Sequence, residues 1–143
     1  MAGTEVTIQF GEWPEIEPEA APIRYAVFVD EQRVPAELEL DEWDARSRHA
    51  LARDVSGRAV GTGRLLPDGH IGRMAVLAPA RALGVGSALL RALMDEARRA
   101  GHATVELSAQ THARAFYERH GFIAYGPEYD DAGIPHVAMR RAL

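Results

Sequence analysis

The loop that precedes the strongest helical pattern of the chain carries residue types that can bind an anion. Gly84 and Gly86 stand two positions apart, Arg81 stands three residues before the first glycine, and an apolar helical stripe follows. A helix that begins there exposes its first backbone N–H groups and the positive end of its dipole. The glycines let a ligand approach the backbone, and Arg81 can add a charge-assisted contact. The spacing fits a phosphate site, although a Gly-x-Gly before a helix is by itself more often a plain turn.

Two common nucleotide-binding loops do not fit this segment. A P-loop requires Gly-Lys-Ser/Thr at the start of the helix, but Gly86 is followed by Ser87 and Ala88. A dinucleotide fingerprint requires a third glycine where the chain has Leu89, and a parallel sheet around it. A phosphate site here is therefore a cradle of backbone groups of another kind.

Apolar periodicity predicts the elements that position this loop. Alternation predicts strands and a 3.6-residue spacing predicts amphipathic helices. The predicted elements are a strand at 4–10, a Pro-rich break at 13–22, a short helix at 23–32, an irregular acidic segment at 33–49, a hairpin at 49–66 with its turn at 56–58, a third antiparallel strand at 70–77, a helix at 85–100, a strand at 103–110, a helix at 112–121, and strands at 122–129 and 135–143. Because crossovers are local and right-handed, strand 103–110 is expected to lie parallel to strand 70–77.

Bulk composition excludes several classes of protein. The chain is 47% hydrophobic and 26% charged with no cysteine, which indicates one globular domain over residues 1–143 without thiolate metal sites. The formal charge of −5 argues against nucleic acid as a partner. Residues 1–22 lack the features of a secretory signal, and no apolar run reaches the roughly 20 residues that cross a bilayer. We expect a cytoplasmic protein without membrane contact, and the histidine spacing predicts no metal site.

An acidic segment follows the predicted helix 23–32. Its carboxylates are Glu37, Glu39, Asp41, Glu42 and Asp44. A charge run of this kind is as often a solvated loop as a functional surface. Arg73 stands inside the apolar strand 70–77 and requires a carboxylate partner if it is buried. We expect Arg73 to pair with this acidic segment.

A second group of residues follows on the next strand-helix unit. Residues 110–122 read Gln-Thr-His-Ala-Arg-Ala-Phe-Tyr-Glu-Arg-His-Gly-Phe, which places Tyr117 on a short helix. Together with the loop at 81–86, this sequence resembles the GCN5-related N-acetyltransferase (GNAT) superfamily, and within it a subgroup of small bacterial acetyltransferases. The loop matches the family's Arg/Gln-x-x-Gly-x-Gly/Ala motif. The later signature, Asn-x-x-Ala-x-x-Phe-Tyr-x-x-x-Gly-Phe, is matched at Ala113, Phe116, Tyr117, Gly121 and Phe122.

The resemblance extends from Ile23 to Met139 and has two departures. Ala82 stands where the family most often has a second glycine, and Gln110 stands where it most often has Asn. The implied architecture is the GNAT fold in the α/β (α+β) class, with element order β-α-β-β-β-α-β-α-β-β. Its mixed, mostly antiparallel central sheet has roughly six to seven strands, flanked by about four helices.

The resemblance also implies a cosubstrate and the residues that hold it. Acetyl-CoA would donate an acetyl group directly to a primary amine in a ternary complex. Strands 70–77 and 103–110 would splay apart, and the pantetheine arm would bond the backbone of Met74 and Val76 as an added strand does. A backbone N–H of Ala75 or Val76 would face the thioester oxygen. The implied cofactor-binding residues are Met74, Ala75, Val76, Arg81, Gly84, Val85, Gly86, Ser87, Gln110 and Tyr117.

Tyr117 is the implied general acid, because an unperturbed tyrosine pKa near 10 keeps the phenol protonated at neutral pH. The base that deprotonates the amine stays open. The candidates are Glu31, Glu39, Asp41, Asp44 and His136. The acidic segment is preferred, as a negative acceptor pocket that favours a cationic amine. A lone histidine at a strand start is more often structural.

Two rival functions share these features. The segments "RYAVFVDEQ" and "ELDEWD" are similar to acyl-homoserine-lactone synthases, and a noncatalytic acyl-CoA sensor would keep the glycine loop. The presence of Tyr117 favours catalysis over sensing. The acceptor, a small-molecule or peptide amine, is not encoded in any pattern of the sequence. The oligomeric state is also open, with a homodimer among the states that the family often forms.

Overall fold

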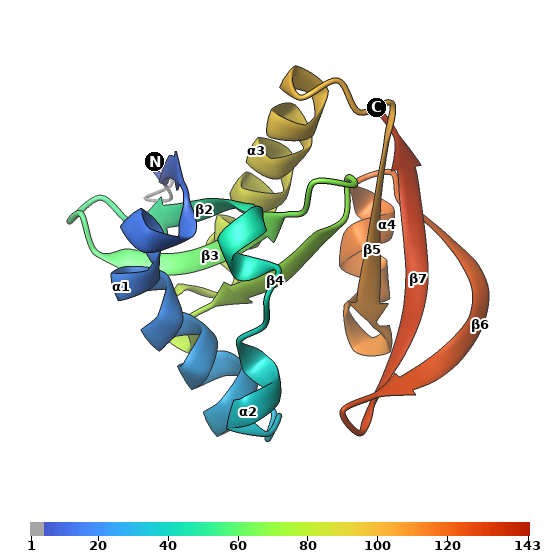
Figure 1. The fold of residues 1–143 in the computed structure, drawn as a ribbon, viewed down its shortest axis with the longest axis horizontal. Coiled ribbons are helices and arrows are strands. Elements are labelled where there is room, and N and C mark those ends of the chain that lie inside the picture. The colour runs from blue at the N-terminus through green and yellow to red at the C-terminus, as the bar shows by residue number, and fades with distance from the viewer. Residues whose placement is uncertain (1–4) are drawn as a thin grey trace.

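The chain forms seven strands in two antiparallel sheets in this computed structural model, which describes residues 5–143 (Figure 1). The first sheet has the order β1-β2-β3-β4, with β1 at Thr7–Gly11, β2 at Arg48–Arg53, β3 at Ala59–Leu65 and β4 at Ile71–Val76. The second has the order β5-β7-β6, with β5 at Thr104–Gln110, β6 at Ile123–Asp131 and β7 at Ile134–Ala142. The predicted fold class and order of strands are confirmed. Thr4, where the first predicted strand begins, lies outside the described residues.

Four α-helices and one π-helix connect and cover these sheets. They are α1 at Trp13–Arg24, the π-helix at Tyr25–Glu31, α2 at Ala36–Glu39, α3 at Val85–Arg99 and α4 at Arg114–Arg119. Short 3₁₀ turns lie at Asp44–Arg46, Ala78–Ala80 and Thr111–Ala113. Within residues 5–143, none of the helices combines the length and apolar character that spanning a membrane requires.

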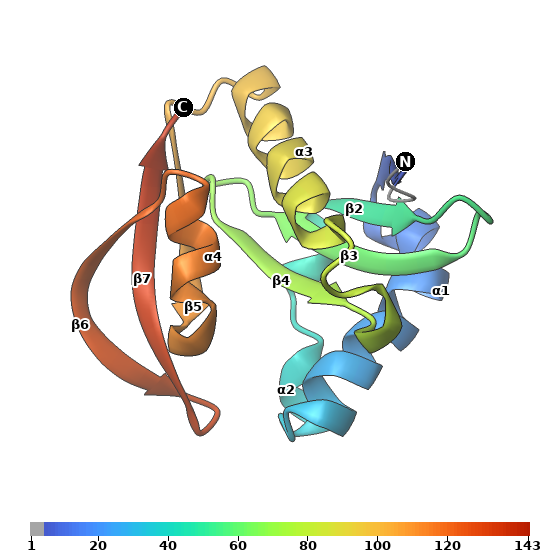
Figure 2. The same cartoon turned by 180° about the vertical axis from the view of Figure 1, so that it is seen from behind.

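The four-stranded sheet is covered on both faces, by α1 on one side and α3 on the other (Figures 1 and 2). Strand β2 shows why, because its side chains alternate between the faces. Ala50 and Ala52 join the core under α3, whereas Leu51 joins the core under α1. The core under α3 also includes residues of β5 and β7, so this one helix packs against both sheets.

Residues 13–22 form most of α1, so the predicted Pro-rich break is wrong. Pro18 and Pro22 lie inside the helix, where each removes a backbone hydrogen bond. Two features outweigh that loss. Glu12 and Glu15 form a capping box at the start of the helix, and its apolar stripe is buried against the sheet. That stripe consists of Ile16, Ala20 and Ile23.

The predicted α-helix at 23–32 is also corrected. Its first residues complete α1, and Tyr25–Glu31 form a π-helix, with Val34 N donating to Phe28 O at 2.8 Å beyond it. The apolar periodicity of this segment is correct in part, since Ile23 and Val27 are buried but Tyr25 is exposed. π-Helical turns occur often at functional sites because they redirect side chains.

Strands β4 and β5 run parallel, as predicted, but they pair at one place only. A single parallel bridge joins His70 to Glu106. Beyond it the strands diverge, and the seven strands divide into two sheets at this point (Figure 1). The edges of β4 and β5 therefore face each other across a gap in which their backbone groups do not pair with one another.

Candidate functional site

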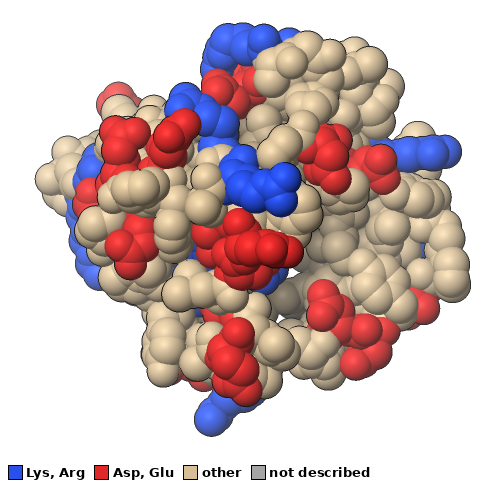
Figure 3. All heavy atoms as spheres, viewed as in Figure 1, with Lys and Arg blue, Asp and Glu red and all other residues tan. Residues whose placement is uncertain are grey.

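The gap between β4 and β5 contains a large cavity. Its volume is about 530 Å³, and its walls come from the π-helix, β4, β5, α4 and β7. Figure 3 shows a hollow between the two sheets, with carboxylate side chains on either side of it. Of the predicted site residues, those on its wall are Glu31, Glu39, Met74, Ala75, Val76, Arg81, Gln110, Tyr117 and His136.

A β-bulge turns β4 toward this cavity. The register between β3 and β4 shifts so that Arg73 and Met74 together face Gly63, and Arg73 has a left-handed φ of 48°. Past the bulge, Leu77 N donates to Val60 O at 2.9 Å, which fixes the alternation of the ladder. Because alternate residues of an edge strand bond to opposite sides, Ala75 directs its backbone groups to β3 and Val76 directs its own into the gap.

The glycine loop ends at the start of α3 without a side-chain cap. Gly84 is the N-cap residue and has a φ of 82°, which glycine adopts without strain. The first N–H groups of the helix, those of Val85, Gly86 and Ser87, consequently have no acceptor within the helix. Ala82 also has a positive φ, of 66°, where the family pattern most often has glycine.

Two polar contacts tie the end of the π-helix to the rest of the site. Arg81 donates two hydrogen bonds to Glu31, both at 2.8 Å, and a third from Nε to Val76 O at 2.9 Å. The hydrogen bond from Arg81 holds the pKa of Glu31 below its usual value. Gln110 donates to Gln32 Oε1 at 2.7 Å across the cavity. Arg81 and Gln110, which were predicted to bind the cofactor, therefore already have protein partners.

Tyr117 enters the cavity from α4. Its ring packs edge-to-face on Phe116 and Phe122, with centroids 5.1 and 5.9 Å away. Burial raises the pKa of Tyr117 to about 12, so the phenol is protonated throughout the neutral range.

His136 lies on β7 and also lines the cavity. Its Nδ1 is 2.7 Å from Ile134 O, and its ring stacks on Tyr129 at 6.0 Å. A carbonyl oxygen only accepts hydrogen bonds, so Nδ1 of the neutral ring carries the proton. Nε2 therefore has a free lone pair, which can accept a proton.

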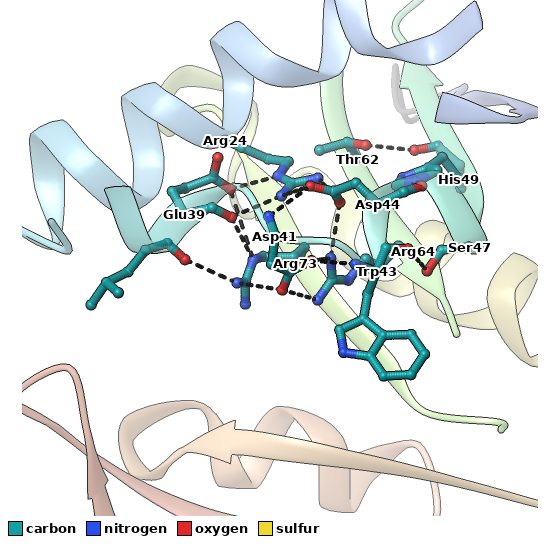
Figure 4. A network of polar contacts seen from close by, with 12 residues as sticks. Arg24, Glu39, Asp41, Trp43, Asp44, Ser47, His49, Thr62, Arg64 and Arg73 are labelled. Atoms are coloured by element: carbon teal, nitrogen blue, oxygen red, sulfur yellow. Dashed lines mark hydrogen bonds and ion pairs between the residues drawn. The ribbon is translucent and has the colours of Figure 1, made fainter. Parts of the chain in front are cut away.

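The acidic segment is neither a solvated loop nor a free negative pocket. Asp44 and Glu39 are buried, and each bonds to the buried Arg24, at 2.8 and 2.6 Å (Figure 4). Arg64, also buried, bonds to Asp41 at 2.7 Å and to Asp44 at 2.9 Å. The carboxylates proposed as bases from the sequence are thus neutralised by arginines.

Arg73 completes this network, as predicted. Its Nη2 lies 3.2 Å from Asp41 Oδ2, and its Nε donates to Glu39 O at 3.1 Å. Burial by itself raises the pKa of Asp44, but the hydrogen bond and charge of Arg24 and the charge of Arg64 outweigh it and lower the value. The pKa of Asp41 is lowered in the same way, chiefly by Arg64. The charges of three arginines and three carboxylates balance in this network. Its ion pairs join α1, α2, β3 and β4.

Comparison with known proteins decides the family. A model described as an acetyltransferase (GNAT) domain matches residues 12–143. The chain belongs to the GNAT family. It is 41% identical over 123 residues to the N-acetyltransferase YjcF of Bacillus subtilis, across 83% of this chain and 87% of that protein. An acyl-CoA N-acyltransferase from Pseudomonas aeruginosa superposes with a TM-score of 0.85 at 31% identity, across 96% of this chain and all (100%) of that one.

ElaA from Escherichia coli superposes with a TM-score of 0.84 at 28% identity, covering 96% of this chain and 99% of that one. Family membership supports an acyltransferase that takes acyl-CoA as cosubstrate. Sequence reasoning missed three residues at or beside this site, Gln32 and the network partners Arg24 and Arg64. Gln32 meets Gln110 across 78 positions of sequence, and no local pattern indicates such a pair.

The strained Ala82 gives a prediction about stability. A non-glycine residue in the left-handed region costs roughly 1–2 kcal/mol, and glycine returns part of this through its larger unfolded-state entropy. Ala82→Gly should therefore raise the free energy of unfolding in urea by about 0.5–1 kcal/mol. Ala115→Gly, on the exposed face of α4, is the control and should lower it by about 1 kcal/mol. Equal destabilisation by both changes would show that position 82 carries no strain.

The buried network gives a second prediction. Asp44→Asn leaves Arg24 and Arg64 without a shared carboxylate and should lower the free energy of unfolding by about 3–5 kcal/mol. Asp95→Asn breaks an exposed pair and should change it by under about 1 kcal/mol. Because the pKa of Asp44 is lowered in the folded state, its contribution is present above about pH 4 and is lost as the pH falls further. Urea titrations should show a shallower acid dependence in Asp44→Asn, and an unchanged dependence contradicts the assignment.

Proposed function

We propose that this protein transfers an acetyl group from acetyl-CoA to a primary amine, directly and within a ternary complex. One observation carries the proposal. The cavity between the diverging strands is lined by Val76 at the free edge of β4, by Arg81, which begins the loop to the uncapped start of α3, and by Tyr117 with its buried phenol. These are a template for an extended arm, a phosphate cradle and a proton donor.

The described residues fit coenzyme A in three places. Val76 offers its C=O to a pantetheine amide N–H once Arg81 has released it, as an edge strand offers its backbone groups to an added strand, with Met74 before it on the same wall. Val85, Gly86 and Ser87 offer their N–H groups to the pyrophosphate next to Gly84. Arg81 can contact a phosphate when its guanidinium leaves Glu31. Gln110, on β5, borders the pantetheine arm.

Val76 is also the donor that stabilises the reacting carbonyl. The sequence left Ala75 and Val76 as alternatives, but Ala75 directs its N–H to β3. An N–H fixed by its strand needs no reorganisation when negative charge develops on the thioester oxygen. The bulge at Arg73 sets the direction of this group.

Proton transfer then uses two side chains that line the cavity, Tyr117 and His136. The lone pair of the neutral amine attacks the thioester carbon, the carbon–sulfur bond breaks, and Tyr117 gives its proton to the departing thiolate. His136 accepts the proton that the amine loses, at Nε2, because Nδ1 is held by Ile134 O. His136 is favoured here over Glu39 and Asp41, since both carboxylates are engaged by arginines. The acceptor, a small molecule or a peptide, and the cytoplasmic location stay predictions.

A screen of diverse amines with acetyl-CoA, detecting the released thiol, tests the proposal. The chain has no lysine, and its 16 cationic residues are all arginines. Label transferred to a protein acceptor's lysines is therefore not confused with acetylation of the enzyme's own side chains. Binding of acetyl-CoA without turnover of any amine would favour a sensor instead.

Tyr117→Phe is the sharpest variant for this mechanism. It removes one hydroxyl and keeps the ring that packs on Phe116 and Phe122. We expect kcat to fall by about 10²–10⁴, while the Kd for acetyl-CoA changes by less than about threefold. Tyr125→Phe removes a hydroxyl that bonds Glu106 outside the cavity wall and should leave kcat near the wild-type value. A wild-type kcat in Tyr117→Phe would remove its assignment as general acid.

A further inference from the structure

A second cleft gathers arginines that the proposed chemistry does not use. It has a volume of about 490 Å³ and lies between α3, the end of α4 and β7. Its walls carry four arginines and one carboxylate, namely Arg91, Arg98, Arg119, Arg141 and Asp95. The carboxylate is already neutralised, because Asp95 bonds to Arg98 at 2.6 Å.

The other three arginines have no carboxylate partner. Among residues 5–143, Arg91, Arg119 and Arg141 take part in no ion pair, although the chain as a whole has more acidic than basic residues. They converge on one side chain, His120. Burial lowers the pKa of His120, and the positive charges of Arg91, Arg119 and Arg141 lower it further. The cleft therefore holds three guanidinium charges around His120, and no carboxylate of the described residues pairs with them.

The position of Arg141 is fixed by its neighbours. A Cβ atom on Gly121 would lie 2.6 Å from its Nε, so only glycine at 121 lets the guanidinium lie across this turn. Its Nη1 also contacts Met94 Sδ at 3.6 Å. A half-buried guanidinium held in this way is preorganised for a ligand, whereas Arg91 and Arg119 are exposed and can close around it.

The cleft is connected to the phosphate cradle. Ser87 stands in the first turn of α3, and its Oγ lies 2.9 Å from His120 Nε2. Arg91 follows one helical turn later, about 6 Å along the axis. Coenzyme A carries its pyrophosphate and a phosphomonoester on the same ribose, so two anion sites at this separation suit the two ends of one nucleotide.

We propose that the cleft lined by Arg91, Arg119, His120 and Arg141 binds a phosphomonoester group. Guanidinium groups match phosphate oxygens with paired N–H donors, and a dianion balances charges that the protein leaves unpaired. Two sources share this chemistry. One is the ribose 3′-phosphate of coenzyme A, which rests on the proposed function, and the other is a free phosphate.

Calorimetry with three probes separates the sources: coenzyme A, 3′-dephospho-coenzyme A and inorganic phosphate. The test variant is Arg91→Gln/Arg119→Gln, which removes two exposed cleft arginines. The matched control is Arg99→Gln/Arg114→Gln, which removes two exposed, ion-paired arginines from the same two helices outside the cleft. Both doubles change the net charge equally.

If the ribose phosphate is the ligand, wild-type protein and the control should bind coenzyme A at least about tenfold more tightly than the dephospho form, and the test variant should lose this preference. If a free phosphate is the ligand, both coenzymes should bind equally, and inorganic phosphate should bind wild type but not the test variant. The proposal is overturned if wild type shows neither effect, or if the test variant keeps the effect. If neither coenzyme binds wild type, the proposed acetyl transfer fails, and the phosphate arm alone decides this site.

Discussion

The structure depends on the fact that β4 and β5 run parallel yet pair at one point, between His70 and Glu106. A backbone that leaves a sheet must satisfy its N–H and C=O groups elsewhere. On β4 the bulge at Arg73 starts this departure, and the C=O of Val76 is already taken by Arg81. The crossover through α3 begins with the loop that leads from Arg81, on the cavity wall, to the uncapped start of the helix. The divergence thus opens a strand edge to the cavity, and the candidate anion site follows it in the chain.

The buried charges keep this geometry in place. Arg24, Arg64 and Arg73 bond to three carboxylates from a segment of only six residues, and this joins the π-helix region to the bulged strand. Such a network gains little stability over an apolar core, but removing one member leaves a buried charge without its partner. Its value lies in holding one arrangement of the cavity wall. It also engages Glu39 and Asp41 with arginines, and His136 is therefore given the role of proton acceptor in the proposal.

Residue spacing in the sequence predicted those features that depend on residues close together in the chain. The glycine loop, the stripe of α3 and the Tyr117 helix follow from spacing within one element, and the pairing of Arg73 follows from the cost of a buried charge. The helix at 13–22 was missed because proline is a local signal, whereas the burial of Ile16 and Ala20 that outweighs it is tertiary. The ion-pair partners of the acidic segment were missed for a related reason. Arg24 and Arg64 stand 20 positions from Asp44 on either side, and no periodicity joins them.

The central claim is that the free edge of β4 at Val76 receives the pantetheine arm. Amide hydrogen exchange, resolved by residue with NMR, tests it directly in the presence and absence of saturating acetyl-CoA. The N–H of Val76 should exchange much more slowly in the complex, whereas that of Ala75, already bonded to β3, should change little. If acetyl-CoA saturates the protein and Val76 exchanges at its free rate, the cosubstrate does not bind along this strand and the account is wrong.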